Sequence, residues 1–375
     1  MTHQADTRNH ARRFATLTVA VIAVGGLFGQ THTQQQKAPI KLGTSGGSAA
    51  NITSSYCCSG TLGAQVADSS GQTYILSNNH ILAEDNLGQI GDAIMQRGYV
   101  DTVPPCSTTG TIVVANLSKF VPISFTTHNA VDAAIAATVS GQVATNGAIL
   151  GIGPVSRTPV AAAVNMAVEK SGRSGVSSGT ISQVGVTAAV GGYGVCGCGQ
   201  SGQPACQTAV FVKQIGITPG TFIQPGDSGS LVVKTPATGA RANPVGLIFA
   251  GSSSMAIANP ISSVLKLLGV TMAAPASTAA ELAEANIAAD PEVERALAVK
   301  DRYNDFLFSL PEVVGHGVGK DASGHAVINL FLQQATDAAR RAAPLSLEGI
   351  PVAIIETGEF RVHPECSAPA QQARN

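Results

Sequence analysis

Short apolar or alternating segments, separated by Gly, Ser, Asn and Pro, occupy the chain from about residue 44 to residue 270. Segments of about four to eight residues with this pattern predict strands. The segments that share it are 60–66, 74–77, 110–114, 133–139, 210–215, 230–233 and 245–249. Many short strands divided by turns are typical of a β-sandwich or β-barrel. We therefore expect a mainly β fold in this part of the chain.

The pattern changes near residue 273. Ala, Glu, Leu and Arg at roughly helical spacing fill 278–310, and Pro291 after Asp290 suits the first turn of a second helix. Beyond residue 311 the elements that the pattern predicts are strands at 313–318, 326–332 and 351–356, a turn at 321–324 and a short helix near 335–341. We expect a helical connector over 273–310. A small C-terminal α/β (β-β-α-β) domain with its tail would cover 311–375, either separate or docked on the β-rich part.

The first 36 residues have the composition of an export signal. Arg8, Arg12 and Arg13 precede an uncharged run, 14–29, that is followed by a polar stretch. The run is shorter than the roughly 20 apolar residues that span a membrane. A Sec signal, a twin-arginine signal and an uncleaved anchor all fit. We expect a secreted or periplasmic/cell-envelope protein that contacts a membrane only if residues 1–36 remain attached.

The composition limits the classes of partner that the protein could bind. With 44% hydrophobic and 12% charged residues and a net charge of −1, the chain has no basic field that would neutralise phosphates. We therefore expect no nucleic-acid partner. Ample apolar content at low net charge also argues against intrinsic disorder.

The cysteines agree with export. Six of the seven lie in the first two thirds of the chain, at 57, 58, 106, 196, 198 and 206. In an oxidising compartment they would form disulfides, whose pairing the sequence leaves open. The Gly-rich segment 196–206 suggests a loop closed by a disulfide. A zinc knuckle is the alternative, but no histidine lies near and the spacing is not C-x2-C. Cys366 is left over, which predicts a free thiol in the tail.

One segment of the β-rich part has the composition of a nucleophile loop. Pro225-Gly-Asp-Ser-Gly-Ser230 places Ser228 between glycines just before an apolar strand, so two backbone N–H groups can converge on one oxygen. A serine hydroxyl needs a base, usually a histidine oriented by a carboxylate. His80 follows a strand-like run, and Asp132 enters an apolar segment where an isolated acid would need a partner.

Simpler interpretations exist for each residue. Ser228 could belong to an ordinary Gly-rich turn, His80 could be a surface histidine, and Asp132 could cap a strand. Three other acids lie near His80 in sequence, namely Asp85, Asp92 and Asp101. They lack an EF-hand pattern, so we interpret them as solvated loop residues rather than calcium ligands.

Five motifs occur together in one order. They are Leu76-Ser-Asn-Asn-His80, Val131-Asp-Ala-Ala-Ile135, Lys170-Ser-Gly-Arg-Ser-Gly175 followed by Gly179-Thr180, Pro225-Gly-Asp-Ser-Gly-Ser230 and Gly246-Leu-Ile-Phe-Ala-Gly251. Residues 44–270 thereby resemble the chymotrypsin-like (trypsin-like) serine peptidases, in a bacterial branch related to a plant trypsin-like protease. The resemblance implies a chymotrypsin-like double β-barrel with the active site between the barrels, and a protease domain over 37–272.

The resemblance also implies roles for residues. His80 would be general base and then general acid, Asp132 would orient it, and Ser228 would be the nucleophile. The backbone N–H groups of Gly226 and Ser228 would form the oxyanion hole. Neither a cofactor nor a metal is implied.

A substrate pocket follows from the same resemblance. Phe222 would lie at its base, and Phe249, Ala250 and Gly251 would form its wall. These positions hold no carboxylate for Arg or Lys, and no histidine of the kind that glutamate-specific members use. We expect a shallow apolar pocket that prefers small or uncharged residues before the cleaved bond.

The C-terminal part resembles a second unit of that branch. Val313-Val-Gly-His-Gly-Val-Gly-Lys320 and the segment 349–358 look like a small domain that elsewhere precedes the protease, whereas here it follows. This unit could shield the cleft, bind a partner or complete the fold.

Together these features predict an exported serine endopeptidase that acts on polypeptides through an acyl-enzyme. The alternative is a catalytically inactive protease-fold binding or envelope protein.

Overall fold

The computed structural model describes residues 1–2 and 31–369. The predicted export signal, with Arg8, Arg12, Arg13 and the run 14–29, lies outside the described residues. Residues 31–369 form one compact unit. None of the described helices is both long and apolar enough to cross a bilayer.

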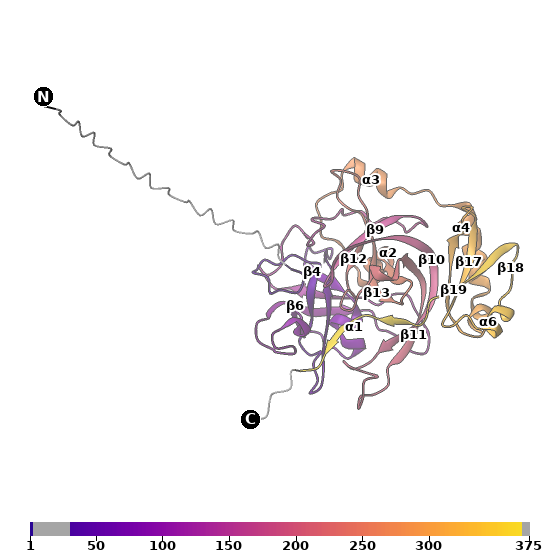
Figure 1. The fold of residues 1–375 in the computed structure, drawn as a ribbon, viewed down its shortest axis with the longest axis horizontal. Helices are drawn as coiled ribbons and strands as arrows, with labels where there is room; N and C mark the ends of the chain where they lie inside the picture. The colour runs from indigo at the N-terminus through magenta and orange to yellow at the C-terminus, as the bar shows by residue number, and fades with distance from the viewer. Residues whose placement is uncertain (3–30, 370–375) are drawn as a thin grey trace. The chain divides into compact units, whose positions relative to one another are not determined.

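Two sheets dominate the fold (Figure 1). The first has the order β15-β3-β4-β8-β6-β5-β1-β2-β21. Its strands are β1 (Thr44–Ser48), β2 (Cys57–Leu62), β3 (Ala64–Ala67), β4 (Thr73–Ser77), β5 (Ala93–Gln96), β6 (Ile112–Phe120), β8 (Ala134–Thr138), β15 (Thr271–Met272) and β21 (Glu365–Ser367). The C-terminal strand β21 therefore pairs with β2, an early strand of the chain.

The second sheet has the order β18-β19-β17-β16-β10-β9-β12-β13-β14-β11-β7, with β20 paired to β10 and β13. Its strands are β7 (His128–Asn129), β9 (Ala167–Gly172), β10 (Gly175–Tyr193), β11 (Gln207–Thr218), β12 (Leu231–Lys234), β13 (Pro244–Gly251), β14 (Ala256–Pro260), β16 (Val313–Lys320), β17 (Ala326–Leu332), β18 (Ser346–Leu347), β19 (Ile350–Glu356) and β20 (Phe360–Val362). The long strands β10 and β11 curve strongly in Figure 1.

Helices are short and mostly follow the β-rich part. They are α1 (Asn79–Leu82), α2 (Ile261–Leu268), α3 (Ala279–Ala285), α4 (Pro291–Arg302), α5 (Asn304–Phe308) and α6 (Asp337–Ala342), with 3-10 turns η1 (Glu84–Asn86), η2 (Tyr99–Asp101) and η3 (Gly220–Phe222). Asp290 caps α4 by accepting from the N–H groups of Glu292 and Val293, and Pro291 takes the first turn, where its missing N–H costs no hydrogen bond.

The mainly β prediction is confirmed, because strands cover most of the segments that the apolar pattern marked. One core is shared between the two sheets. Leu62 and Ile75 of the first sheet and Leu247 of β13 belong to it and are fully buried.

The C-terminal unit continues the second sheet. β16 pairs antiparallel with β10, and β17 lies between β16 and β19. α4 packs on β16 and β17, so every residue of β17 is buried. Ile217, Val299 and Leu330 therefore share one core, although they come from the β-rich part, the helical connector and the C-terminal unit. The domain boundaries at 272 and 310 stay a prediction.

Candidate active site

His80 and Asp132 lie where two neighbouring strands meet. His80 belongs to α1, directly after β4, and Asp132 precedes β8, which pairs with β4 through Ser77 and Ala134. Both side chains are buried. His80 Nδ1 lies 2.6 Å from Asp132 Oδ2, and the His80 backbone N–H donates to Asp132 Oδ1 at 3.3 Å. The structure thus brings these two predicted residues into direct contact.

Further hydrogen bonds hold Asp132 at its carboxylate and at its backbone N–H. The Tyr193 hydroxyl donates to Asp132 Oδ2 at 3.0 Å, and the Asp132 backbone N–H donates to Asn259 Oδ1 at 3.0 Å. Burial, together with the charges of Asp132 and Asp85, raises the pKa of Tyr193 well above its usual value, so its hydroxyl stays protonated and donates. Sequence reasoning missed Tyr193, because nothing local marks a tyrosine at the end of β10 as a partner of Asp132.

Two of the three acids near His80 are not solvated loop residues, which corrects that expectation. Asp85 accepts from the Gly194 N–H at 2.6 Å, and burial raises the pKa of its carboxyl to about 7. Asp101 pairs with Arg173 at 2.8 Å. Both acids thus make hydrogen bonds to residues more than 70 positions away in the sequence.

Ser228 lies in the loop between η3 and β12. Gly226 and Gly229 on either side have φ of +86° and +94°, which a residue with a side chain rarely adopts. Gly229 also packs against the Ser77 side chain and the Thr61 carbonyl, so it has no room for a Cβ. The loop between glycines that the sequence predicted therefore forms, with a tight turn at Ser228.

A buried ion pair supports this loop. Lys170 Nζ lies 2.6 Å from Asp227 Oδ2, and both side chains are fully buried. Asp227 also accepts from the backbone N–H groups of Ser174 at 3.0 Å and Gln224 at 2.9 Å. Burial lowers the pKa of Lys170, although Asp227 opposes that shift. Lys170 belongs to one of the five sequence motifs, but nothing in the sequence indicates that it pairs with Asp227.

The loop is bonded to the first sheet. The Thr61 N–H donates to the Ser228 carbonyl at 2.8 Å, and Thr61 Oγ1 donates to the Gly226 carbonyl at 2.8 Å. Ser77 at the end of β4 donates to the Thr61 carbonyl at 2.7 Å. One chain of hydrogen bonds thus runs from the Ser228 loop through β2 to the strand that leads into His80.

Ser228 and His80 do not share a hydrogen bond. Ser228 Oγ donates to the Phe249 carbonyl at 3.1 Å. His80 Nε2 is buried and makes no hydrogen bond to any described residue. The Gly226 N–H, a predicted oxyanion donor, donates to the His363 carbonyl at 2.7 Å. The predicted nucleophile and one predicted oxyanion donor are therefore hydrogen-bonded to the protein's own carbonyl groups.

The predicted pocket residues, Phe222, Phe249, Ala250 and Gly251, are all buried. Their neighbourhood includes a residue that the expectation of a pocket without histidine did not foresee. His363 Nε2 lies 3.3 Å from the Gly251 carbonyl oxygen, and burial lowers the pKa of His363. The pocket wall is thus in contact with a histidine supplied by the C-terminal tail.

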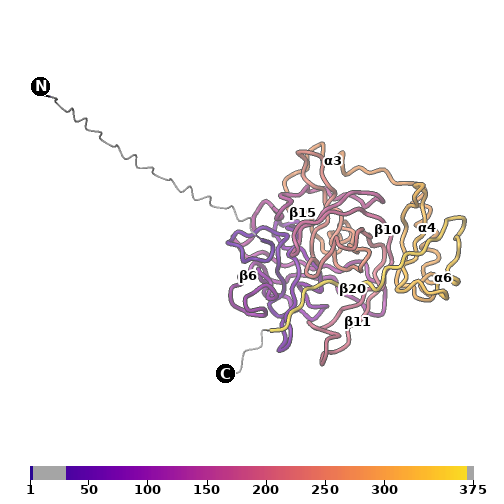
Figure 2. The backbone as a smooth tube through the Cα atoms, viewed as in Figure 1, coloured from indigo at the N-terminus to yellow at the C-terminus, as the bar shows by residue number. Residues whose placement is uncertain are grey.

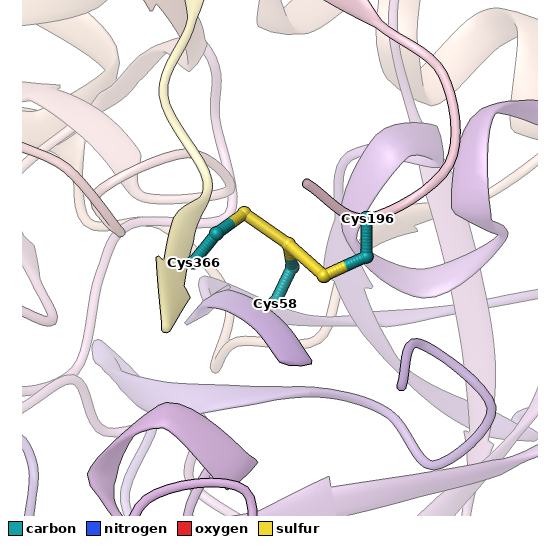
Figure 3. Close-up of side chains that lie close together, drawn as sticks. All are labelled: Cys58, Cys196 and Cys366. Carbon is teal, nitrogen blue, oxygen red and sulfur yellow. A yellow bond between two sulfur atoms is a disulfide. The ribbon is translucent and has the colours of Figure 1, made fainter. Parts of the chain in front are cut away.

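Disulfides join the loops around the site. Cys57 pairs with Cys106, and Cys198 pairs with Cys206, which closes the predicted loop and removes both sulfurs from any zinc knuckle. Cys366 is not an isolated thiol, which corrects that expectation: its sulfur lies at bonding distance from Cys58, as does the sulfur of Cys196 (Figure 3).

Comparisons with known proteins give structural likenesses only. No protein-family model matches the chain, and a search of the curated proteins finds no match. Among solved structures, a glutamic acid-specific serine protease is 20% identical, with a TM-score of 0.40, and the match covers 62% of this chain and 100% of that one. A Nocardiopsis protease is 15% identical, with a TM-score of 0.38 and coverage of 61% and 97%. Cellulomonas bogoriensis chymotrypsin is 19% identical, with a TM-score of 0.36 and coverage of 58% and 94%.

These structures are serine proteases, the class that the sequence motifs resemble. Because the TM-scores lie below 0.5, they transfer no residue role to this chain. The roles of His80, Asp132 and Ser228 must come from the geometry of this protein.

Proposed function

We propose that the protein is an exported serine endopeptidase that hydrolyses polypeptides without a cofactor. The observation that carries the proposal is the buried contact of 2.6 Å between His80 Nδ1 and Asp132 Oδ2. A carboxylate only accepts hydrogen bonds, so Nδ1 donates to it and Nε2 keeps its lone pair. His80 Nε2, buried and without a hydrogen bond among the described residues, is then the atom that can take a proton.

The reaction proceeds through an acyl-enzyme. Rotation of the Ser228 hydroxyl away from the Phe249 carbonyl brings its proton to His80 Nε2 as Oγ attacks the peptide carbonyl. The backbone N–H groups of Gly226 and Ser228 stabilise the oxyanion. His80 then gives the proton to the leaving amine, and water, activated in the same way, hydrolyses the ester and frees Ser228.

Two expectations from the sequence complete the proposal. The buried Phe222, Phe249, Ala250 and Gly251 support a pocket for small or uncharged residues before the cleaved bond. A peptide library in which cleavage after Arg, Lys or Glu dominates would overturn that preference. The disulfides Cys57–Cys106 and Cys198–Cys206 favour an oxidising location outside the cytoplasm.

Labelling with a fluorophosphonate tests the activated serine. The full chain should label at one site, and Ser228→Ala should abolish labelling. Ser253→Ala, an exposed serine after β13, should label like the parent. Labelling that survives in Ser228→Ala would refute the assignment.

One observation favours the alternative, a protease-fold binding or envelope protein without activity. Ser228 Oγ and the Gly226 N–H both donate to carbonyl groups of the protein itself. A binding protein would fail to label under every condition, including those that free the site from the C-terminal tail.

A further inference from the structure

The C-terminal segment 360–367 crosses the candidate active site from the second sheet to the first. β20 pairs antiparallel with β13 at Ala250–Val362 and Gly251–Arg361, along the predicted pocket wall. β21 then pairs with β2, where Cys366 lies opposite Cys58. In Figure 2 the yellow tube returns past β20 to the indigo strands of the N-terminal part. The segment therefore bridges the two halves that supply His80 and Ser228.

Between these two strands, His363 contacts both the loop that holds Ser228 and the end of β13. Its carbonyl accepts from the Gly226 N–H at 2.7 Å, and its ring nitrogen lies 3.3 Å from the Gly251 carbonyl oxygen. Peptides commonly bind by adding a strand to an exposed edge, with main-chain hydrogen bonds for affinity and pockets for side chains. The segment thus takes up hydrogen bonds of β13 and Gly226 that a polypeptide substrate needs.

Side chains anchor the same segment. Phe360 and Val362 are buried, and the Glu365 carboxylate lies 3.2 Å from Arg173 Nη1. A pocket beside His80 has walls that include the tail residues Arg361, Val362 and Pro364. Displacing the tail would therefore open the surface around His80.

Three sulfurs meet at this pocket. The chain has seven cysteines, and the pairs Cys57–Cys106 and Cys198–Cys206 use four, which leaves Cys58, Cys196 and Cys366. The three sulfur atoms lie within 4.8 Å of one another, and Figure 3 shows the Cys58 sulfur between the other two. A sulfur atom forms only one disulfide, so Cys58–Cys366 and Cys58–Cys196 are alternatives.

We propose that Cys58, Cys196 and Cys366 form a thiol–disulfide exchange site that latches the segment 360–367 in the active-site cleft and releases it. In the latched state Cys58 is bonded to Cys366 and Cys196 is a thiol. The Cys196 thiolate attacks Cys58 Sγ, the Cys58–Cys196 bond forms, and the Cys58–Cys366 bond breaks. The electron pair leaves on Cys366 Sγ, which takes up the proton that Cys196 lost. The exchange needs no oxidant or reductant.

In the latched state the segment 360–367 competes with substrate for the cleft and so inhibits the enzyme. Release weakens this inhibition because the segment loses its covalent tether. Once Cys366 is a thiol, the strand pairings of β20 and β21 and the Arg173–Glu365 contact alone hold the segment. A covalent tether keeps the segment at a high local concentration in the cleft. When the tether opens, a substrate therefore competes with the segment more effectively. The latch rests on the proposed function in one respect: the cleft that it closes is the substrate cleft.

Two single variants separate the states. Cys196→Ser allows only the latched pairing, and Cys366→Ser allows only the Cys58–Cys196 pairing. Hydrogen exchange of 360–367 should be slow in Cys196→Ser and fast in Cys366→Ser, and fluorophosphonate labelling of Cys366→Ser should be faster by about tenfold or more. The double variant Cys198→Ser/Cys206→Ser removes a disulfide of the same loop and should exchange like the parent.

Disulfide mapping of the full parent chain provides a further test. After acid quenching and alkylation, both pairings should be found, with the free thiol shared between Cys196 and Cys366. Equal exchange of the tail in the two single variants, a single pairing under all thiol concentrations, or one equivalent of zinc bound by the three reduced cysteines would overturn the latch.

The two proposals fail separately. If no variant labels but tail exchange still depends on the pairing, the peptidase proposal fails and the latch stands. If all variants label at one rate and their tails exchange alike, the latch fails and the peptidase proposal stands.

Discussion

The two halves of the candidate site differ in how completely they are assembled. At the first sheet, His80 and Asp132 contact each other directly, and Tyr193 at the end of β10, from the second sheet, adds a further hydrogen bond to the carboxylate. On the second sheet, glycines and a buried ion pair shape the loop, but Ser228 Oγ donates to Phe249 rather than to His80. The proposed base, His80, is thus oriented by its carboxylate, whereas the proposed nucleophile and one proposed oxyanion donor are hydrogen-bonded within the chain.

The two halves therefore differ in the free energy needed to rearrange them. Separating His80 from Asp132 would leave a buried carboxylate without its partner, which is unfavourable. In the proposed mechanism Ser228 Oγ gives up only its hydrogen bond to the Phe249 carbonyl, and Gly226 exchanges one carbonyl acceptor for another. Regulation is therefore easier to build on the Ser228 side, where the tail lies.

The largest expected effect comes from removing the negative charge of Asp132. Asp132→Asn keeps the size of the side chain but favours the wrong tautomer of His80, so the rate of fluorophosphonate labelling should fall by about 10⁴-fold. Asp92→Asn, which alters a loop acid that accepts from the Gln89 N–H, should leave the rate unchanged. A fall of less than tenfold in Asp132→Asn would mean that His80 is not oriented by this carboxylate.

Breaking the ion pair beneath the other half should mainly affect stability. Lys170→Met leaves Asp227 buried without its counter-charge, and the free energy of unfolding in urea should fall by about 3–5 kcal/mol. Lys170→Met/Asp227→Asn should recover part of that loss. Lys234→Met removes a more exposed pair with Glu284 and should cost less than about 1 kcal/mol. A loss that small in Lys170→Met would show that the pair does not support the Ser228 loop.

The free energy of unfolding should depend on pH because of Asp85, a carboxyl near His80. Burial raises the pKa of Asp85 to about 7, above its value in the unfolded chain, so its ionisation opposes folding. The resulting loss of stability is absent below about pH 4, grows as the pH rises to 7 and then stays constant. Asp85→Asn removes it, and we expect a gain of about 1–2 kcal/mol at pH 8 after discounting for solvent at a half-buried carboxyl.

The same experiment contains its control. At pH 4 the unfolding free energies of Asp85→Asn and the parent should converge, because the carboxyl is protonated in the folded chain. A gain that is equal at pH 4 and pH 8 would assign the effect of the substitution to packing rather than to charge.

The smallest expected effect concerns Tyr193. Tyr193→Phe removes one of the hydrogen bonds to Asp132, worth about 1 kcal/mol, so labelling should slow by about fivefold. A labelling rate equal to that of the parent would mean that the Tyr193 hydroxyl does not help to hold this carboxylate.

Much of the fold was accessible from local pattern. The strands around Gly60, Tyr74 and Val210 and the helix start at Pro291 follow from apolar alternation, turn formers and capping, which act over a few residues. The joining of the C-terminal strands to β10 was not accessible, because pairing between strands more than 100 residues apart leaves no local signal.

The candidate site divides in the same way. The sequence by itself determined the residue types and their order, from His80 through Asp132 to Ser228, and the glycines that the Ser228 turn requires, since backbone conformation and side-chain chemistry are local properties. Only the tertiary structure decided which groups meet: Tyr193 with Asp132, Lys170 with Asp227, and Cys366 with Cys58. It also decided that the His363 carbonyl lies on the Gly226 N–H, because a contact between distant segments depends on how both sheets pack and not on either segment alone.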